Sequence, residues 1–188
     1  MNKIIQLVGI PASGKSYLLG LCSERDIFGG LNYIEFGNEL KDLLVKAQNR
    51  EEPDVERAVR DLIDDIVKDR QPAIFTSHAV FYNDRGFTYN ADLELYTRSA
   101  GYVHLYSDPE TILNRRIKDE KMGVKFRNME DLEFIAMHQR VSLQVVQDMA
   151  NQIGANFMSI ENESGYEETN LAKIRDFVEV TLNGKQNS

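Results

Sequence analysis

Eight consecutive residues near the start of the chain have the types and spacing needed to bind the phosphates of a nucleotide. They match the phosphate-loop (P-loop) pattern G-x-x-x-x-G-K-[ST] in full, between an apolar strand-like run and a helical segment. Glycines let backbone N–H groups surround phosphate oxygens, and the start of a helix adds its positive dipole end. We expect ATP to be bound by Gly9, Ile10, Pro11, Ala12, Ser13, Gly14, Lys15, Ser16 and Tyr17.

Two side chains at the end of this loop are suited to act on the phosphates themselves. Lys15 supplies a positive charge for the β- and γ-phosphates, and the Ser16 hydroxyl is placed to ligate Mg²⁺. We expect Lys15 to be exposed to solvent when no nucleotide is bound. The pattern therefore predicts ATP as the donor substrate and Mg²⁺ as the cofactor.

The stretch from residue 115 to residue 127 is basic in an otherwise acidic chain. It carries six cations, with only Asp119 and Glu120 as acidic neighbours: Arg115, Arg116, Lys118, Lys121, Lys125 and Arg127. Arginines stabilise the charge that spreads over a phosphoryl group during its transfer. We expect Arg115, Arg116 and Arg127 to act in this way. Adjacent helical residues point about 100° apart, so only one of the first two should face a cleft at a time.

Further residues could bind a second, phosphorylated substrate. The candidates for its phosphate are four arginines from the middle of the chain, and the sequence does not choose among them: Arg50, Arg57, Arg60 and Arg85. His78 follows a predicted central strand, at the end where open α/β sheets bind ligands. His104 is expected to be a core or edge residue of a strand, and His138 to pack in its helix or to cap the flap. The three histidines lack metal-ligand spacing, so we predict no zinc site.

Alternating strands and helices would position these side chains. Buried strand-like runs are expected at 3–8, 33–36, 73–75, 102–106 and 156–160. Helices are expected at 15–24, 39–47, 54–67, from Pro109 onwards, at 129–152 and at 167–182. This order predicts an α/β P-loop NTPase fold in three layers, a five-stranded parallel sheet with helices on both faces. We expect a single domain over 1–188, with a helical substrate-binding insertion at about 37–70 and a short arginine-rich lid at about 115–130.

Composition limits the classes of partner. The 188 residues hold 22 Lys and Arg against 30 Asp and Glu, a net charge of −8 that argues against binding bulk nucleic acid. One cysteine, Cys22, excludes a disulfide framework and a thiolate zinc cluster. Without a leader or an apolar run of about 18 residues, we expect no membrane association and a cytoplasmic location.

The P-loop alone does not decide the reaction. A GTPase is excluded because the chain has neither an Asn-Lys-x-Asp motif nor an Asp-x-x-Gly switch. An AAA-type motor or an ABC-type ATPase is disfavoured by the small size and by the lack of a strand of four hydrophobic residues ending in Asp-Glu. The small kinases remain, in which a second substrate binds opposite the P-loop and an arginine-rich flap closes over both.

From Lys3 to about Asn162, the order of elements and several motifs resemble the archaeal-type adenylate kinases. The motifs that carry the resemblance are Gly9-Ile10-Pro11 with Gly14-Lys15, Phe36-Gly37, Ser77-His78-Ala79, Arg85-Gly86-Phe87, Arg115-Arg116, Arg127-Asn128, His138-Gln139 and Gly154-Ala155. The resemblance implies phosphoryl transfer from ATP to AMP, an acceptor site that includes Phe36, Gly37 and His78, and a homotrimer.

One departure from that family concerns the metal. The family places an aspartate, which would hold Mg²⁺ through water, at the position of Thr76. Asp84 and Asp92 are possible substitutes. Two other functions stay open on the same scaffold: a kinase for another small molecule or nucleoside, and an adenylate-kinase-like ATPase that serves as an assembly factor.

Overall fold

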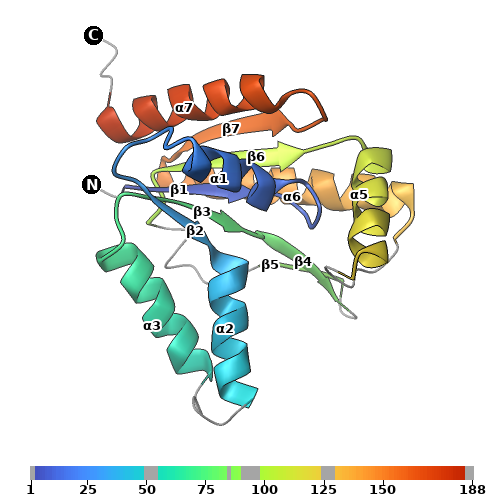
Figure 1. Ribbon diagram of the computed structural model, residues 1–188, viewed down its shortest axis with the longest axis horizontal. Helices are drawn as coiled ribbons and strands as arrows, with labels where there is room; N and C mark the ends of the chain where they lie inside the picture. Colours follow the sequence, from blue (N-terminus) through green and yellow to red (C-terminus); the bar gives the residue numbers. More distant parts are fainter. Residues whose placement is uncertain (1–2, 49–54, 84–85, 90–97, 124–129, 185–188) are drawn as a thin grey trace.

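A central sheet of five parallel strands organises the chain. The computed structural model describes residues 3–48, 55–83, 86–89, 98–123 and 130–184. The strands lie in the order β2-β3-β1-β6-β7 (Figure 1). Their bounds are β1 Ile4–Val8, β2 Asn32–Glu35, β3 Ala73–Ser77, β6 Gly101–Tyr106 and β7 Asn156–Glu161. The five-stranded parallel sheet predicted from the sequence is confirmed.

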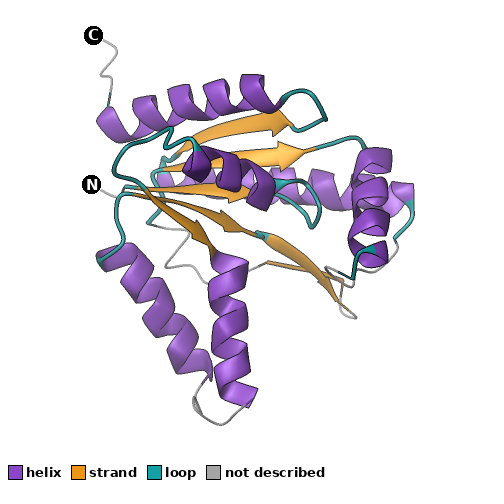
Figure 2. Ribbon diagram, viewed as in Figure 1, coloured by secondary structure: helices purple, strands orange, loops and turns teal. Residues whose placement is uncertain are grey.

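Strand β1 shows why the sheet needs helices on both faces. All five of its residues are buried, because successive side chains point to opposite faces and both faces are covered. Ile5 and Leu7 pack in one core cluster with α1 (Lys15–Glu24) and α7 (Glu167–Asn183). Ile4 and Val8 point to the other face, which α3 (Val55–Lys68) and α6 (Leu132–Ile153) cover. Figure 2 shows the resulting layers of helix, strand and helix.

Helices α2 (Phe36–Gln48) and α3 form an arm between β2 and β3 (Figure 1). The arm occupies the place of the expected insertion. Helix α2 begins earlier than expected, directly at Phe36, and β2 therefore ends at Glu35 rather than Phe36. Glu35, opposite Thr76 of β3, is the last residue of β2 that pairs in the ladder, and α2 begins at the next residue. The ring of Phe36 packs on Phe75, with 6.5 Å between the ring centroids.

Two aspartates fix the starts of the helices on the other side of the molecule. Helix α5 (Pro109–Lys121) begins after Asp108, whose side chain accepts a hydrogen bond from the backbone N–H of Glu110 at 2.8 Å. Helix α6 begins after Asp131, which accepts from the N–H of Phe134 at 2.7 Å. These are N-caps, which satisfy N–H groups that the helix itself leaves unpaired. The cap places the described start of α6 at Leu132 rather than at the expected residue 129.

A small antiparallel hairpin was not expected from the sequence. Strands β4 (Val80–Asn83) and β5 (Gly86–Tyr89) pair with each other and not with the main sheet. The hairpin follows β3 directly, so it continues from the end of the sheet where open α/β folds bind ligands. None of the helices within the described residues is long and apolar enough to span a bilayer.

Candidate active site

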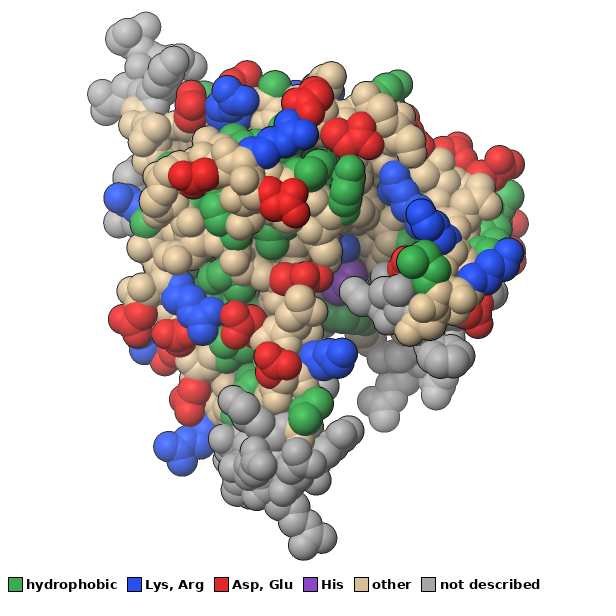
Figure 3. Space-filling view, viewed as in Figure 1, with side chains coloured by type: hydrophobic (Ala, Val, Ile, Leu, Met, Phe, Trp, Pro, Cys, Tyr) green, Lys and Arg blue, Asp and Glu red, His purple; other side chains and the backbone are tan. Residues whose placement is uncertain are grey.

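A cleft of about 680 Å³ lies at the carboxyl ends of the sheet strands. In Figure 3 it is the hollow near the centre of the face shown, with lysine and arginine side chains on its α5 side and a histidine at its back. Its lining comes from the P-loop and the start of α1, from the ends of β2 and β3, from α2, from the β4–β5 hairpin, from the segment after β7, and from α5 and α7. The lining residues are Pro11, Ala12, Gly14, Lys15, Ser16, Tyr17, Glu35, Phe36, Gly37, Leu40, Thr76, Ser77, His78, Phe81, Arg115, Asp119, Asn162, Glu163, Ser164 and Glu167.

The P-loop backbone leaves no space for larger residues at its two glycines. A Cβ on Gly9 would lie 2.5 Å from the Leu105 carbonyl oxygen, and one on Gly14 would lie 2.2 Å from Asn162 Nδ2. Gly14 also has a φ of 91°, in the left-handed region that favours glycine. The Asn162 amide donates to the Ser13 carbonyl at 2.8 Å. The loop is thus held from outside by the residue that follows β7.

Lys15 is buried, with 7% of its surface exposed, which corrects the expectation that it faces solvent. Its ammonium group donates to the carbonyl oxygens of Gly9 at 2.8 Å and Ile10 at 2.9 Å. The loop curls around the side chain, so the backbone supplies the oxygens that an ammonium group requires. Lys15 nevertheless lines the cleft.

Ser16 contacts a carboxylate that the sequence analysis did not single out. The Ser16 hydroxyl donates a hydrogen bond to Glu35 Oε1. The second oxygen of Glu35 accepts from the Asn38 amide at 2.8 Å. The available signal was the position of Glu35 at the carboxyl end of a strand in an open α/β sheet. Tyr17, by contrast, is 57% exposed at the edge of the same cleft.

Arg115 lies on the cleft wall and links three loops. Its guanidinium donates to Ser107 Oγ at 2.9 Å and to the backbone carbonyl oxygens of Asn162 at 2.7 Å and Ala12 at 3.4 Å. The first two contacts come from the segments after β6 and β7, and the third comes from the P-loop. The arginine is therefore held with its charge beside the phosphate-binding loop.

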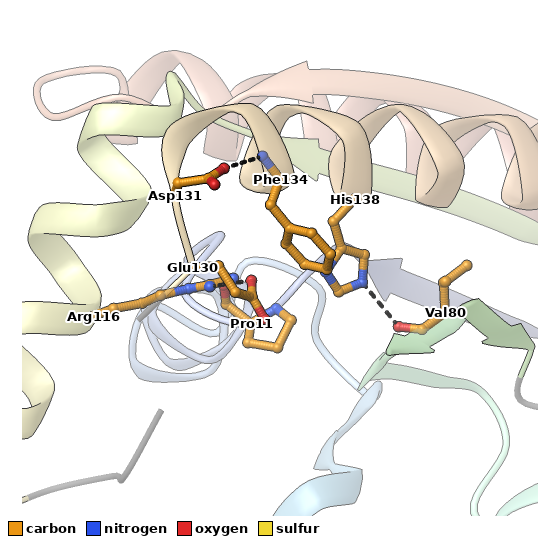
Figure 4. A network of polar contacts seen from close by, with 7 residues as sticks. All are labelled: Pro11, Val80, Arg116, Glu130, Asp131, Phe134 and His138. Atoms are coloured by element: carbon orange, nitrogen blue, oxygen red, sulfur yellow. Dashed lines mark hydrogen bonds and ion pairs between the residues drawn. The ribbon is translucent and has the colours of Figure 1, made fainter. Parts of the chain in front are cut away.

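Arg116 does not line the cleft. Its side chain is 2% exposed and makes an ion pair with Glu130, 2.5 Å between Nη1 and Oε2. Nη2 donates to the Pro11 carbonyl at 3.4 Å, so Arg116 supports the P-loop from behind (Figure 4). The expectation that only one of the adjacent arginines faces the cleft agrees with this placement, and Arg115 is the one that does.

Three of the residues expected for the acceptor come together in the cleft. Phe36, Gly37 and His78 all line the cleft. His78 Nδ1 lies 3.0 Å from the Gly9 carbonyl oxygen, and because a carbonyl only accepts, this nitrogen carries the proton. The His78 ring also contacts Phe81, with centroids 5.8 Å apart. The histidine thus connects the donor loop to the acceptor wall.

The arginines expected at the acceptor phosphate are not brought to this wall. Arg57 and Arg60 are exposed on α3 and do not line the cleft. Arg57 makes an exposed ion pair with Asp61, 3.8 Å between Nε and Oδ2. The remaining expected residues lie outside the described part of the chain: Arg50, Arg85 and Arg127, together with Asp84 and Asp92.

The other two histidines have packing roles, as expected. His104 is 1% exposed, and its Nε2 lies 3.2 Å from Ser142 Oγ. Burial, and to a lesser extent the charge of Lys15, lowers the pKa of His104 to about 4. His138 lies 3.3 Å from the Val80 carbonyl and packs against Phe134 (Figure 4). Burial also lowers the pKa of His138.

Comparison with known proteins places the chain in a family. Residues 8–133 match the family model described as AAA domain. That description names a domain and not a reaction, so it decides neither for nor against a motor. A comparison with curated proteins finds no match. The family match covers more than half of the chain, which therefore belongs to the AAA domain family.

Two solved structures are similar to this chain. Shikimate kinase from Acinetobacter baumannii in complex with shikimate matches with a TM-score of 0.57 and 16% identity, over 100% of this chain and 97% of that one. An uncharacterized protein from Eubacterium ventriosum ATCC 27560 matches with a TM-score of 0.45 and 11% identity, over 94% of this chain and 98% of that one. The first match shows that the chain shares the fold of a P-loop kinase. Neither match names an adenylate kinase.

Proposed function

We propose that this member of the AAA domain family is a Mg²⁺-dependent kinase that moves the γ-phosphoryl group of ATP to a nucleoside monophosphate, with AMP as the expected acceptor. One observation carries the proposal. A single cleft joins a complete P-loop, with Lys15 and Ser16, to Arg115 and to a second wall formed by Phe36 and His78. Phosphoryl transfer requires two anions to be placed in line while charge on the moving group is neutralised.

The residues divide this work by position. Backbone N–H groups of the P-loop, which Pro11 alone among its residues lacks, would bind the β- and γ-phosphates at the start of α1, as helix N-termini bind anions. Lys15 and Arg115 lie on the same cleft wall and would stabilise the negative charge of the transferring group. Mg²⁺, when bound with the nucleotide, neutralises phosphate charge, and the Ser16 hydroxyl is an oxygen ligand of the kind it requires.

Support for AMP comes from the acceptor wall. Phe36, Gly37, Ser77 and His78, which carry part of the resemblance to archaeal-type adenylate kinases, all line the cleft. An aromatic ring and a hydrogen-bonding histidine suit a purine base better than a small neutral substrate. Base recognition by paired hydrogen bonds can discriminate by up to about 10⁴-fold, so we expect a sharp preference.

The test is kcat/KM for AMP, GMP, CMP, UMP and dTMP at a fixed concentration of MgATP. We expect AMP to be the best acceptor and the reaction to stop when Mg²⁺ is chelated. A higher value for CMP or dTMP would overturn the choice of AMP and keep the reaction class. Slow ATP hydrolysis with no transfer to any acceptor would instead favour the nucleotide-dependent assembly factor.

A second candidate is a kinase that phosphorylates a hydroxyl group of a small molecule. The observation that favours it is the charge of the cleft: within the described residues, Lys15 and Arg115 are its only lysine and arginine. An uncharged acceptor needs no further cation, whereas a monophosphate does. Transfer to a hydroxyl compound, with none to the five monophosphates, would identify this function.

Assembly and location are also proposed, from the resemblance and the composition. We expect a homotrimer in the cytoplasm, without membrane association and without binding to bulk nucleic acid. Light scattering of the purified protein at several concentrations would measure the mass of the assembly. A monomer at all concentrations would contradict the expected trimer.

A further inference from the structure

We propose that Glu35 is the carboxylate of the magnesium site, acting together with Ser16 at the end of the P-loop. The inference deepens the proposed function, because it rests on binding of a magnesium–nucleotide complex, but it depends on no particular acceptor. Glu35 takes the role that the resemblance assigns to an aspartate at the position of Thr76. Asp84 and Asp92, the substitutes that the sequence offered for that role, lie outside the described residues.

The contact between the two side chains is direct. Ser16 lies in the first turn of α1, and its hydroxyl donates to Glu35 Oε1. A serine hydroxyl has one proton to donate and two lone pairs. When that proton is directed to Glu35, the lone pairs remain available for a cation. The carboxylate therefore orients the Ser16 oxygen as a ligand and places a negative charge beside it.

Strand register explains how Glu35 replaces a residue on another strand. Glu35 and Thr76 are direct partners in the parallel ladder between β2 and β3. Neighbouring strands lie about 4.8 Å apart, and both carboxyl ends open on the same edge of the sheet. A glutamate is one methylene longer than an aspartate, which extends its reach from β2 toward the P-loop. Thr76 itself is only 5% exposed.

The local contacts fix the carboxylate in this orientation. Asn38, one turn into α2, donates its amide to Glu35 Oε2 at 2.8 Å, which leaves Oε1 directed at Ser16. Glu163, another acidic residue of the cleft, is occupied elsewhere. Its two oxygens accept from the Asp108 N–H and from the Thr111 hydroxyl. Asn38 thus acts as a positioning residue for Glu35.

The chemistry of the site fits magnesium bound together with phosphates. Mg²⁺ prefers six oxygen ligands, and it usually takes one or two from protein, with the others from substrate phosphates and water. Within the described residues, no group of three or more His, Cys, Asp and Glu could hold a metal ion without such help. A hydroxyl with one carboxylate beside it matches a cation that arrives with a nucleotide rather than one held by protein alone.

The experiment measures ADP affinity of the full chain by titration calorimetry, once with Mg²⁺ and once with EDTA. The ratio of the two dissociation constants is the gain due to magnesium. We expect Glu35→Gln to reduce this gain by at least about tenfold, the size of effect seen when groups that orient metal ligands are removed. In EDTA the variant should bind ADP as tightly as wild type or more tightly, because a negative charge near the phosphates is gone.

Control variants separate this effect from others. Glu24→Gln removes one exposed carboxylate at the far end of α1 and should leave the magnesium gain unchanged. Asn38→Ala should reduce the gain in the same direction as Glu35→Gln, by a smaller factor. Thermal unfolding without nucleotide verifies the fold of each variant. If Glu35→Gln does not fold, Glu35→Ala provides a second neutral side chain for the same measurement.

Two results would overturn the inference. The first is a magnesium gain in Glu35→Gln equal to that of wild type. This holds even if the variant no longer transfers a phosphoryl group, because its metal-dependent binding would persist. The second is an equal loss of affinity with Mg²⁺ and with EDTA, which would assign Glu35 a packing role. Failure of the wild-type protein to transfer a phosphoryl group would refute the proposed function. Loss of the magnesium gain in the Glu35→Gln variant of that protein would still support this inference.

Discussion

The two sides of the cleft are built differently. On one side, Arg115 and Asn162 hold the P-loop through hydrogen bonds from two separate segments, and the buried Arg116, paired with Glu130, donates to the Pro11 carbonyl. On the α2–α3 arm, by contrast, the ion pairs Arg57–Asp61 and Lys68–Asp64 are exposed and lie off the cleft.

The difference is also one of energy. Exposed ion pairs contribute about 0–1 kcal/mol each, whereas breaking a buried pair leaves an uncompensated charge and costs several kcal/mol. The donor site is therefore preorganised by the core of the protein. The α2–α3 arm is supported mainly by the apolar face of α3 against β2 and β3. Substitutions on the two sides should accordingly have effects of different kinds and sizes.

The largest effect is expected at Lys15. Lys15→Met keeps the buried stem and removes the charge, so kcat should fall by at least about 10²–10³-fold, as expected when a group that stabilises transition-state charge is lost. Turnover with the best acceptor measures this. Lys173→Met removes an exposed lysine of α7 and should leave kcat unchanged. Normal turnover by a folded Lys15→Met protein would refute the P-loop assignment.

The adjacent arginines should separate stability from activity. Arg116→Ala leaves Glu130 without its partner, so the free energy of unfolding should fall by about 3 kcal/mol in urea titrations. Arg115→Ala should lose less stability but lower kcat by about 10²-fold, because its charge lies on the cleft wall. If Arg116→Ala lowered kcat and left stability intact, our assignment of the two roles would be reversed.

A smaller effect is expected from pH. The pKa of His104 is lowered to about 4 in the folded chain from an ordinary value of 6.5, so between these values the unfolded state binds more protons. The contribution of His104 to the free energy of unfolding is therefore fully present above about pH 6.5. It decreases as the pH falls toward 4, by up to about 1.4 kcal/mol per pH unit. Urea unfolding at pH 7.5 and 5.0 measures the slope.

A histidine variant provides the control for this pH dependence. His104→Gln should flatten the slope without abolishing it, because the pKa of His138 is lowered in the same direction. An unchanged slope in His104→Gln would show that other groups cause the pH dependence.

The smallest effect is expected on the arm. Arg57→Ala or Arg60→Ala should change the KM of the acceptor by less than about twofold and stability by less than about 0.5 kcal/mol, because both side chains are exposed and lie off the cleft. Initial-rate kinetics and urea titration test each variant. A tenfold rise in KM would mean that these arginines do bind the acceptor, as the sequence analysis expected.

The sequence predicted those features that depend on local patterns. The P-loop between a strand and a helix is a contiguous motif, and the five strands of the main sheet follow from apolar runs. The helix that begins at Pro109 was an equally local prediction. The alternation of strands and helices then sufficed for a parallel sheet with two covered faces.

The features that sequence analysis missed depend on contacts between distant segments. Glu35 meets Ser16 only because β2 and β3 pair in one particular register. Lys15 is buried because the loop carbonyls turn toward it, which no pattern of residue types indicates. The adjacency of two arginines predicted that only one of them faces the cleft. That this one is Arg115 and not Arg116 depends on how α5 packs against the P-loop.

The β4–β5 hairpin has a consequence for local unfolding. A two-stranded hairpin is marginally stable by itself, and this one is held by the start of α6. The Val80 carbonyl meets His138, and Phe87 stacks on Phe134 with 5.8 Å between ring centroids. The hairpin and the first turns of α6 should therefore open together as one cooperative unit. Amide hydrogen exchange should then give the same free energy of opening for both segments. Because Phe81 of this hairpin contacts His78, the acceptor wall should loosen at a lower free energy than the P-loop behind it.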